Sequence, residues 1–186
     1  MGEGPGEKAS VEVTLKNGEL LEIRVATRDD AEAILAYIET ASAESTFLTF
    51  GPGEFEMTVE QESDFLDASA QSANQVYLVG HVNGELIASA HVGASSRERL
   101  RHRGEMGMSV RRSHWGQGVG AAMLDFVIDW ARKNPVLTKL DLQVRVDNTR
   151  GVALYRGRGF IEEGVLRNQF RVGDELYDLI AMGMDV

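Results

Sequence analysis

The chain has 186 residues, of which 43% are hydrophobic, and its formal net charge is −10. It has no cysteine, which excludes disulfides and thiolate metal sites, and no apolar run approaches the roughly 18 residues of a transmembrane helix. These features predict one compact domain over residues 11–186 of a cytoplasmic protein. Residues 1–10 lack the apolar core of a signal peptide and are expected to form a disordered lead-in.

Hydrophobic periodicity divides the chain into strands and helices. Alternating apolar residues predict strands at 11–15, 19–26, 75–82, 85–93, 105–110, 139–146, 160–167 and 175–184. Helical spacing predicts helices at 31–40, 58–70, 121–130 and 148–158. The first two strands form an N-terminal hairpin, and Asn83-Gly84 predicts a second tight turn. This order indicates an α/β (α+β) fold with one central mixed, mostly antiparallel sheet of six to seven strands, flanked by about four helices.

Charge is spread unevenly over these elements. Residues 91–160 hold 13 Lys/Arg and 6 Asp/Glu, whereas residues 1–90 hold 4 and 17. A basic segment inside an acidic chain favours an anionic ligand there, while the acidic segments either attract a cationic substrate or provide solubility. The basic run at 97–103 is short and reads as a solvated loop, so neither a nucleic acid nor a membrane is expected as a partner.

A glycine-rich loop, Trp115-Gly116-Gln117-Gly118-Val119-Gly120, lies between the strand at 105–110 and the helix at 121–130. Its backbone N–H groups and the positive end of the helix dipole predict a phosphate or pyrophosphate site. A Walker loop is excluded because no Lys-Ser/Thr follows Gly120. A dinucleotide fingerprint fits poorly because the spacing is Gly-x-Gly-x-Gly and the loop lies past mid-chain.

This loop resembles the signature of the GNAT superfamily of N-acetyltransferases, Gln/Arg-x-x-Gly-x-Gly/Ala, with Trp115 in place of the usual first residue. A second segment, 147–160, resembles the family's later motif, Asn-x-x-Ala-x-x-Leu-Tyr-x-x-x-Gly-Phe, with the alanine shifted to Ala153. The pattern at 160–167, followed by Tyr177-Asp178, resembles the branch that acts on ribosomal-protein α-amino groups, free amino acids and antibiotics. The resemblance covers roughly residues 20–186 and implies a single GNAT-like domain.

The resemblance also implies a reaction and its residues. Acetyl-CoA would be the cosubstrate, no metal would be needed, and a primary amine of a small molecule or peptide would attack directly in a ternary complex. Glu105 would be the base and Tyr155 the acid that protonates the departing sulfur. Arg112 is a further source of charge beside the pyrophosphate. The residues expected to bind the cofactor are Met108, Val110, Arg111, Gly116, Gln117, Gly118, Val119, Gly120, Ala121 and Asn148.

Each assignment has a purely structural alternative. Glu105 would then face solvent or pair with Arg103, Asn148 would be a plain helix cap, and Tyr155 would be a core aromatic residue. For the whole chain, the alternative is a non-catalytic acyl-CoA sensor on the same fold. The protein is expected to be a monomer or a homodimer.

The segment 42–57 is expected to cover the acceptor site, or else to be a packed surface loop. Its acidic residues Glu44, Glu54 and Glu56 would favour a cationic amine.

Overall fold

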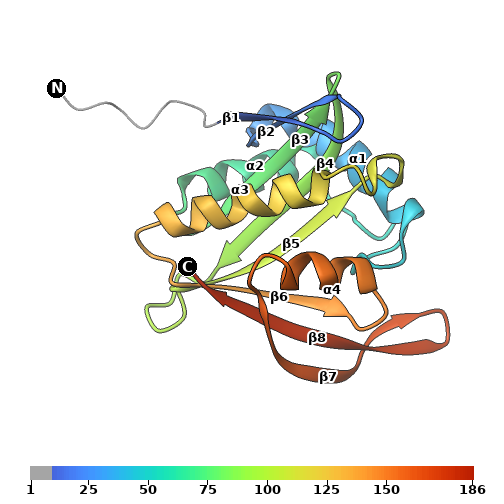
Figure 1. Ribbon diagram of the computed structural model, residues 1–186. Helices are drawn as coiled ribbons and strands as arrows, with labels where there is room; N and C mark the ends of the chain where they lie inside the picture. Colours follow the sequence, from blue (N-terminus) through green and yellow to red (C-terminus); the bar gives the residue numbers. More distant parts are fainter. Residues whose placement is uncertain (1–9) are drawn as a thin grey trace.

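One sheet organises the molecule. A computed structural model describes residues 10–186 (Figure 1), so the expected lead-in lies almost wholly outside the described residues. The strands are β1 (Ser10–Thr14), β2 (Leu20–Val25), β3 (Val76–Val82), β4 (Glu85–Ala94), β5 (Arg103–Val110), β6 (Lys139–Arg145), β7 (Ile161–Val172) and β8 (Glu175–Asp185). They form an eight-stranded sheet in the order β1-β2-β3-β4-β5-β6-β8-β7.

The predicted fold class is confirmed, but the predicted count of six to seven strands is too low. The N-terminal hairpin is not an appendage, because β2 pairs with β3 from Leu21↔Val82 to Val25↔Leu78 and so extends the central sheet. Every neighbouring pair is antiparallel except β5 and β6, which run parallel. The sheet is therefore mixed and mostly antiparallel, as expected.

Four α-helices cover the two faces of this sheet (Figure 1). They are α1 (Ala31–Glu44), α2 (Val59–Gln71), α3 (Val119–Lys133) and α4 (Thr149–Arg156). Helix α1 runs four residues further than predicted and buries Ala41 and Ser42 in its last turns. Helix α4 ends at Arg156, two residues earlier than predicted, because the next turn is tighter: the N–H groups of Arg158 and Gly159 donate to carbonyls three residues back.

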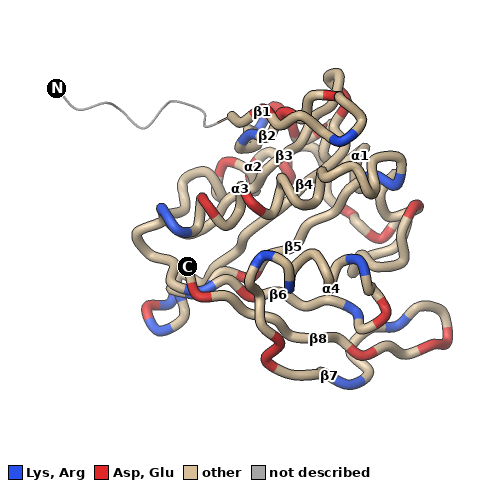
Figure 2. The backbone as a smooth tube through the Cα atoms, viewed as in Figure 1, with Lys and Arg blue, Asp and Glu red and all other residues tan. Residues whose placement is uncertain are grey.

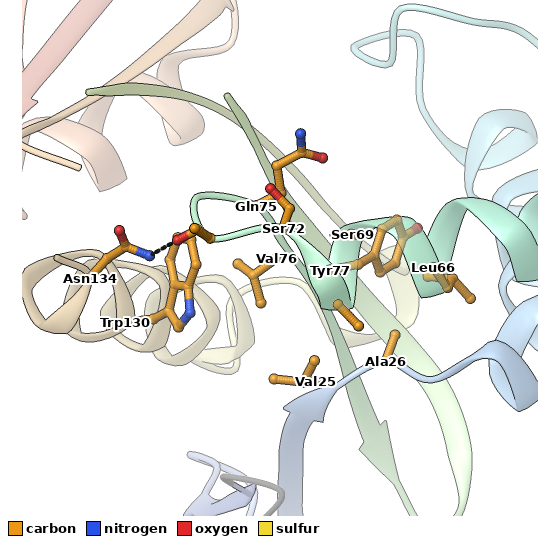
Figure 3. A pocket seen from close by; sticks show the side chains of 12 residues that line it. Val25, Ala26, Leu66, Ser69, Ser72, Gln75, Val76, Tyr77, Trp130 and Asn134 are labelled. Atoms are coloured by element: carbon orange, nitrogen blue, oxygen red, sulfur yellow. Dashed lines mark hydrogen bonds between the residues drawn. The ribbon is translucent and has the colours of Figure 1, made fainter. Parts of the chain in front are cut away.

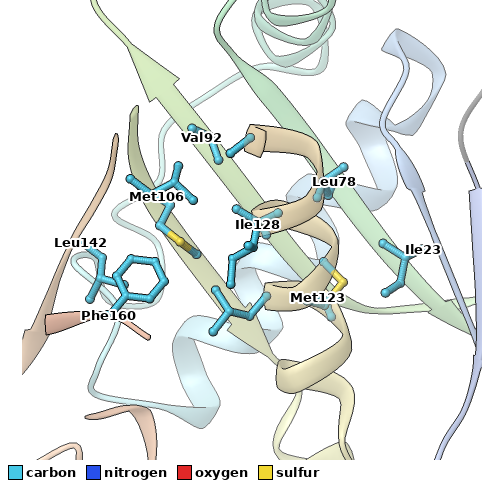
Figure 4. Packing of buried hydrophobic residues seen from close by; sticks show 14 of the residues in the cluster. Ile23, Leu78, Val92, Met106, Met123, Ile128, Leu142 and Phe160 are labelled. Carbon is cyan, nitrogen blue, oxygen red and sulfur yellow. The ribbon is translucent and has the colours of Figure 1, made fainter. Parts of the chain in front are cut away.

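Two hydrophobic cores lie on opposite faces. The larger joins α3 to the sheet: Met123 and Ile128 pack toward Leu78, Val92 and Met106 (Figure 4). The smaller lies under α1 and α2 and includes Ile34, Tyr37, Leu66 and Val79. No helix within residues 10–186 is both long and apolar enough to cross a bilayer.

The junction of β5 and β6 positions the candidate site. The two strands pair only from Arg103↔Lys139 to Glu105↔Asp141. Beyond these three pairs β5 continues to Val110 and β6 to Arg145, and the strands diverge (Figure 1). This opening, called the wedge below, leaves one edge of β5 without a strand partner.

A cavity of about 240 Å³ lies elsewhere, between α2, α3 and the ends of β2 and β3 (Figure 3). Trp130 of α3 and Asn134, directly after that helix, line it on one side, and Leu66 and Ser69 of α2 line it on the other. None of the predicted site residues lines it.

Candidate active site

The free edge of β5 presents backbone groups to the wedge. The Arg111 N–H donates to the Ile87 carbonyl of β4 over 2.8 Å, so the backbone of Arg111 faces β4. Because successive residues of an antiparallel strand point their backbone groups to opposite edges, Met108 and Val110 point theirs into the wedge. The Val110 carbonyl accepts a hydrogen bond from the Trp115 indole N–H at 2.7 Å. The other backbone groups of Met108 and Val110 stay available to an extended ligand.

The glycine loop continues from this edge as a cradle of N–H groups. Gly116 and Gly118 have φ of 78° and 102°, a region that side-chain-bearing residues rarely adopt. The six backbone N–H groups from Gly116 to Ala121 donate to no group within residues 10–186. A Cβ added at Gly116 or Gly118 would meet nothing within 4 Å, so the space in front of the loop is open. Unpaired N–H groups at the start of α3 form an anion site that fits a pyrophosphate.

The N-terminal hairpin holds the outer side of this loop. The Lys16 N–H donates to the Gln117 carbonyl over 3.1 Å, and the Asn17 amide donates to Gln117 Oε1 over 2.7 Å. The side chain of Gln117 is therefore occupied by the hairpin, whereas its backbone N–H remains unpaired. Sequence reasoning missed this brace, because nothing in the local pattern at 16–17 refers to a loop 100 residues later.

Basic side chains beside the loop include Arg112, as expected, and one further arginine. The guanidinium of Arg111 pairs with Glu44 at 3.0 Å and with Glu85 at 3.3 Å. Arg112 and Arg150 instead lie near the indole of Trp115, with 5.9 Å and 5.5 Å from each guanidinium carbon to the ring centroid. Arg150, at the start of α4, was not predicted to belong to the site.

Glu44 in turn does not act as a free acid of the acceptor segment. It accepts a backbone hydrogen bond from Arg112 as well as the ion pair with Arg111. Burial opposes ionisation, but these donors outweigh it and lower the pKa of Glu44. The negative charge of Glu44 is therefore already neutralised by its partners in the protein.

Helix α4 carries the two residues of the second motif. The Oδ1 atom of Asn148 accepts from the Gly151 N–H at 3.0 Å, so Asn148 is the helix cap, and its amide nitrogen donates to no described group. Tyr155 lies two turns further on and packs in the same core as Met108 and Val110. Its ring contacts Phe160, with 5.9 Å between the centroids.

The hydroxyl of Tyr155 makes no hydrogen bond with any residue from 10 to 186. Burial in this core raises the pKa of Tyr155 to about 12. The group therefore stays protonated at neutral pH and can serve as a proton donor. Tyr155 is both a packed aromatic residue and the bearer of an unpaired hydroxyl.

Glu105 lies at the vertex of the wedge, on the opposite face of the sheet. Along β5 the neighbours Gly104 and Met106 are buried, whereas Glu105 is exposed. The expected alternative partner, Arg103, pairs with Asp141 at 2.6 Å instead. Glu105 makes no ion pair or side-chain hydrogen bond with the described part of the chain. Its carboxylate is free to accept a proton.

The segment after α1 crosses the wide end of the wedge on this same face. The Arg145 guanidinium of β6 donates to the Thr46 carbonyl at 2.8 Å and lies 4.7 Å from the ring centroid of Phe47. The same group stacks 3.8 Å from the ring centroid of Tyr177 and pairs with Asp147. Arg145 thus ties this segment to β8, and the connection closes one side of the face that carries Glu105.

The model of the acetyltransferase (GNAT) family matches residues 37–160. The chain belongs to this family. Over 79 residues it is 39% identical to the [ribosomal protein bS18]-alanine N-acetyltransferase of Escherichia coli, covering 42% of this chain and 53% of that one. The chain spans about half the length of the curated relatives it matches. These matches support the predicted superfamily and its ribosomal-protein branch.

Solved structures agree with the fold. A GNAT acetyltransferase from Streptococcus pneumoniae superposes with a TM-score of 0.88 at 29% identity, covering 89% of this chain and 99% of that one. A Salmonella typhimurium protein solved with its cofactor acetyl-CoA superposes with a TM-score of 0.78 at 20% identity, covering 89% and 93%. The second likeness concerns the fold alone.

The left-handed conformation of Gly118 leads to a testable expectation for this GNAT loop. Gly118→Ala should cost about 1–2 kcal/mol in stability because alanine is strained at a φ of 102°. Relief of the strain would turn N–H groups out of the cradle, so coenzyme A should bind roughly tenfold more weakly, or about 1.4 kcal/mol. Thermal unfolding and isothermal titration calorimetry measure the two effects. Gly164→Ala, on open strand β7 without a positive φ, is the matched control and should change neither.

Proposed function

We propose that the protein is an acetyl-CoA-dependent N-acetyltransferase in which a primary amine attacks the thioester directly. The observation that carries the proposal is the wedge, which joins three features. Its free β5 edge leads into the six unpaired N–H groups of the glycine loop, its vertex carries the unpaired carboxylate of Glu105, and Tyr155 packs against the same core as Met108 and Val110. The unpaired N–H groups and the open space before them fit a pyrophosphate.

Acetyl-CoA, when bound, would supply the activated acetyl group. The N–H groups from Gly116 to Ala121 would hold its pyrophosphate, and the backbone of Met108 and Val110 would align the pantetheine and polarise the thioester carbonyl. The amine nitrogen forms a bond to the carbonyl carbon as the carbon–sulfur bond breaks. Glu105, directly or through one water, accepts the proton that the amine loses, and Tyr155 donates its hydroxyl proton to the sulfur.

The two proton transfers answer two problems of the reaction. A free alkylamine has a pKa of about 10.4 and a peptide α-amino group one of about 7.7–8.0, so either is mostly protonated at pH 7 and needs a base before it can attack. The thiolate is a better leaving group once a proton reaches it. Because Glu105 and Tyr155 project from opposite faces of the sheet, the base and the acid approach the reacting carbon from different sides.

We further propose that the acceptor is a peptide or protein α-amino group, in preference to a small-molecule amine. The naming of relatives as ribosomal-protein-alanine N-acetyltransferases supports this. Glu105 is exposed on the same face of the sheet that the segment held by Arg145 crosses at the wide end of the wedge. This suits an extended acceptor that places only its terminal amine in the wedge.

Thiol release from acetyl-CoA, measured across a panel of N-terminal peptides, amino acids and small amines, tests the proposal. We expect turnover with at least one peptide and the appearance of an acetylated N-terminus in mass spectrometry. Binding of coenzyme A without turnover on any amine would instead identify the non-catalytic acyl-CoA sensor. The unpaired carboxylate of Glu105 favours an enzyme over a non-catalytic sensor, because binding acyl-CoA alone does not require a base.

A further inference from the structure

Four charged side chains join the strands at the vertex of the wedge. Arg103 Nε lies 2.6 Å from Asp141 Oδ2, and Lys139 Nζ lies 3.0 Å from Asp141 Oδ1 and 2.6 Å from Glu163 Oε1. We call these four residues the clasp. Basic and acidic residues lie together at this end of the sheet, near the C-terminus (Figure 2). Two cations and two carboxylates cancel, so the clasp carries no net charge.

Asp141 is the centre of the clasp. It is 7% exposed, and each of its oxygens accepts from a different cation. It is also the direct strand partner of Glu105 across the β5–β6 pair. Two carboxylates therefore stand side by side at the vertex, one with two cationic partners and one with none.

Arg103 lies within reach of both carboxylates. It precedes Glu105 by two residues on the same strand, so both side chains leave the same face about 6–7 Å apart. The bond to Asp141, with smaller contributions from Glu105 and Glu163, raises the pKa of Arg103. Arg103 therefore interacts electrostatically with Glu105 while it is bonded to Asp141.

The other elements around Glu105 bring little charge. On β4, Gly93 is the strand partner of Glu105, and His91 lies two residues before it on the same face. Burial lowers the pKa of His91, so its ring is neutral at pH 7. On β8, Gly183 is the partner of Asp141, and further along β5 the same face carries Ser109. On β5 itself, Arg103 is the cation that lies close enough to pair with Glu105.

We propose that Asp141 is a positioning residue that holds Arg103 away from Glu105 and thereby keeps Glu105 free to accept the proton of the amine. A carboxylate paired with a guanidinium is a weaker base, because an opposite charge within about 4–6 Å favours its ionised form. The inference rests on the proposed function, since it assigns the clasp a role through Glu105. It goes beyond that function because it explains why this carboxylate, and not its neighbour, is unpaired.

Asp141→Asn tests the proposal. The amide keeps the volume of the side chain but removes its charge, and Arg103 is then free to pair with Glu105. Arg103 is half exposed and Lys139 keeps Glu163, so neither cation is left buried without a partner. We expect kcat/KM to fall roughly tenfold or more and the acid limb of its pH profile to move about one unit lower. KM for acetyl-CoA should stay unchanged.

The double variant Asp141→Asn/Arg103→Gln distinguishes positioning from a merely structural role. Removal of the freed cation should restore both the rate and the acid limb to near wild-type values. If Asp141→Asn acted only by disturbing the packing, a second substitution at Arg103 would not restore them. Arg103→Gln alone should stay near wild type. Arg101→Gln, a neighbouring arginine that pairs with Glu98, is the matched control when combined with Asp141→Asn and should restore nothing.

A pH profile of Asp141→Asn that coincides with that of wild type would overturn the proposal, and so would a double variant that does not recover. Carbon-13 NMR of the Glu105 carboxyl in the free protein gives a readout without turnover. Its titration midpoint should move down in Asp141→Asn and return in the double variant. Inactive wild-type protein would contradict the proposed function, and the NMR titration would still decide whether Asp141 shields Glu105.

Discussion

Tyr155→Phe is expected to lower kcat by roughly 10²–10⁴-fold while coenzyme A binding stays nearly intact. The phenylalanine ring keeps the packing against Phe160 and the surrounding core, so only the proton donor is lost. Without it the sulfur must leave as a thiolate, which raises the barrier of the chemical step and not the cost of binding. Steady-state kinetics with acetyl-CoA as the varied substrate separates an effect on chemistry from an effect on binding. We expect kcat to fall and KM for acetyl-CoA to stay unchanged.

Two further measurements make this result specific. The pKa of Tyr155 is raised to about 12, so the hydroxyl stays protonated through pH 6–10 and wild-type activity should show no alkaline limb from this group. Thermal unfolding should show no loss of stability, since the hydroxyl has no hydrogen-bond partner among residues 10–186. Tyr77→Phe removes a hydroxyl from another partly buried tyrosine, on β3, and should leave kcat unchanged. An unchanged rate in Tyr155→Phe would remove this residue from the acid role.

Glu105→Gln is expected to lower kcat/KM at neutral pH by a similar factor, roughly 10²–10⁴-fold. Glutamine keeps the size of the side chain, and because position 105 is exposed the substitution does not disturb the packing of the core. The variant should depend on amine that is already deprotonated in solution. For the proposed peptide acceptor, its rate should therefore rise about tenfold per pH unit toward the pKa of the α-amino group, about 7.7–8.0, and level off above it.

The pH profile decides between Glu105 and other routes for the proton. If Glu105 is the base, the wild-type acid limb is replaced in Glu105→Gln by one set by the pKa of the amine, and the two rates approach each other at high pH. Parallel profiles for wild type and variant would point to a different base. Glu98→Gln, an exposed carboxylate in the loop before β5 that pairs with Arg101, is the control and should follow the wild-type profile.

Local patterns were enough to predict most elements of this fold. Alternation located the strands to within a few residues, and Asn83-Gly84 forms the predicted tight turn, with φ of 51° and 80°. Helix α3 starts directly after the left-handed Gly118 of the glycine-rich loop, and Asn148 caps α4, as the local sequence indicates. These features depend on the backbone preferences of a few consecutive residues, which a single sequence displays directly.

The partners of charged side chains could not be predicted in this way. The guanidinium of Arg111, for example, pairs with Glu44, a residue far away in the chain. The proximity of Arg150 to Trp115 and the pairing of Arg103 with Asp141 also depend on how β5, β6 and α4 meet in space. The long side chain of an arginine can reach several carboxylates, and only the tertiary structure determines which of them it pairs with.

The brace between the N-terminal hairpin and Gln117 has a consequence for how this protein should be shortened. The GNAT model begins at residue 37, after the hairpin, yet Lys16 and Asn17 hold the loop proposed to bind the pyrophosphate. A chain trimmed to the matched residues would also lose β2, whose Leu21 and Ile23 are fully buried, and both strands of the C-terminal hairpin. The segment that matches the family model, residues 37–160, is thus shorter than the domain, whose sheet includes strands before and after it.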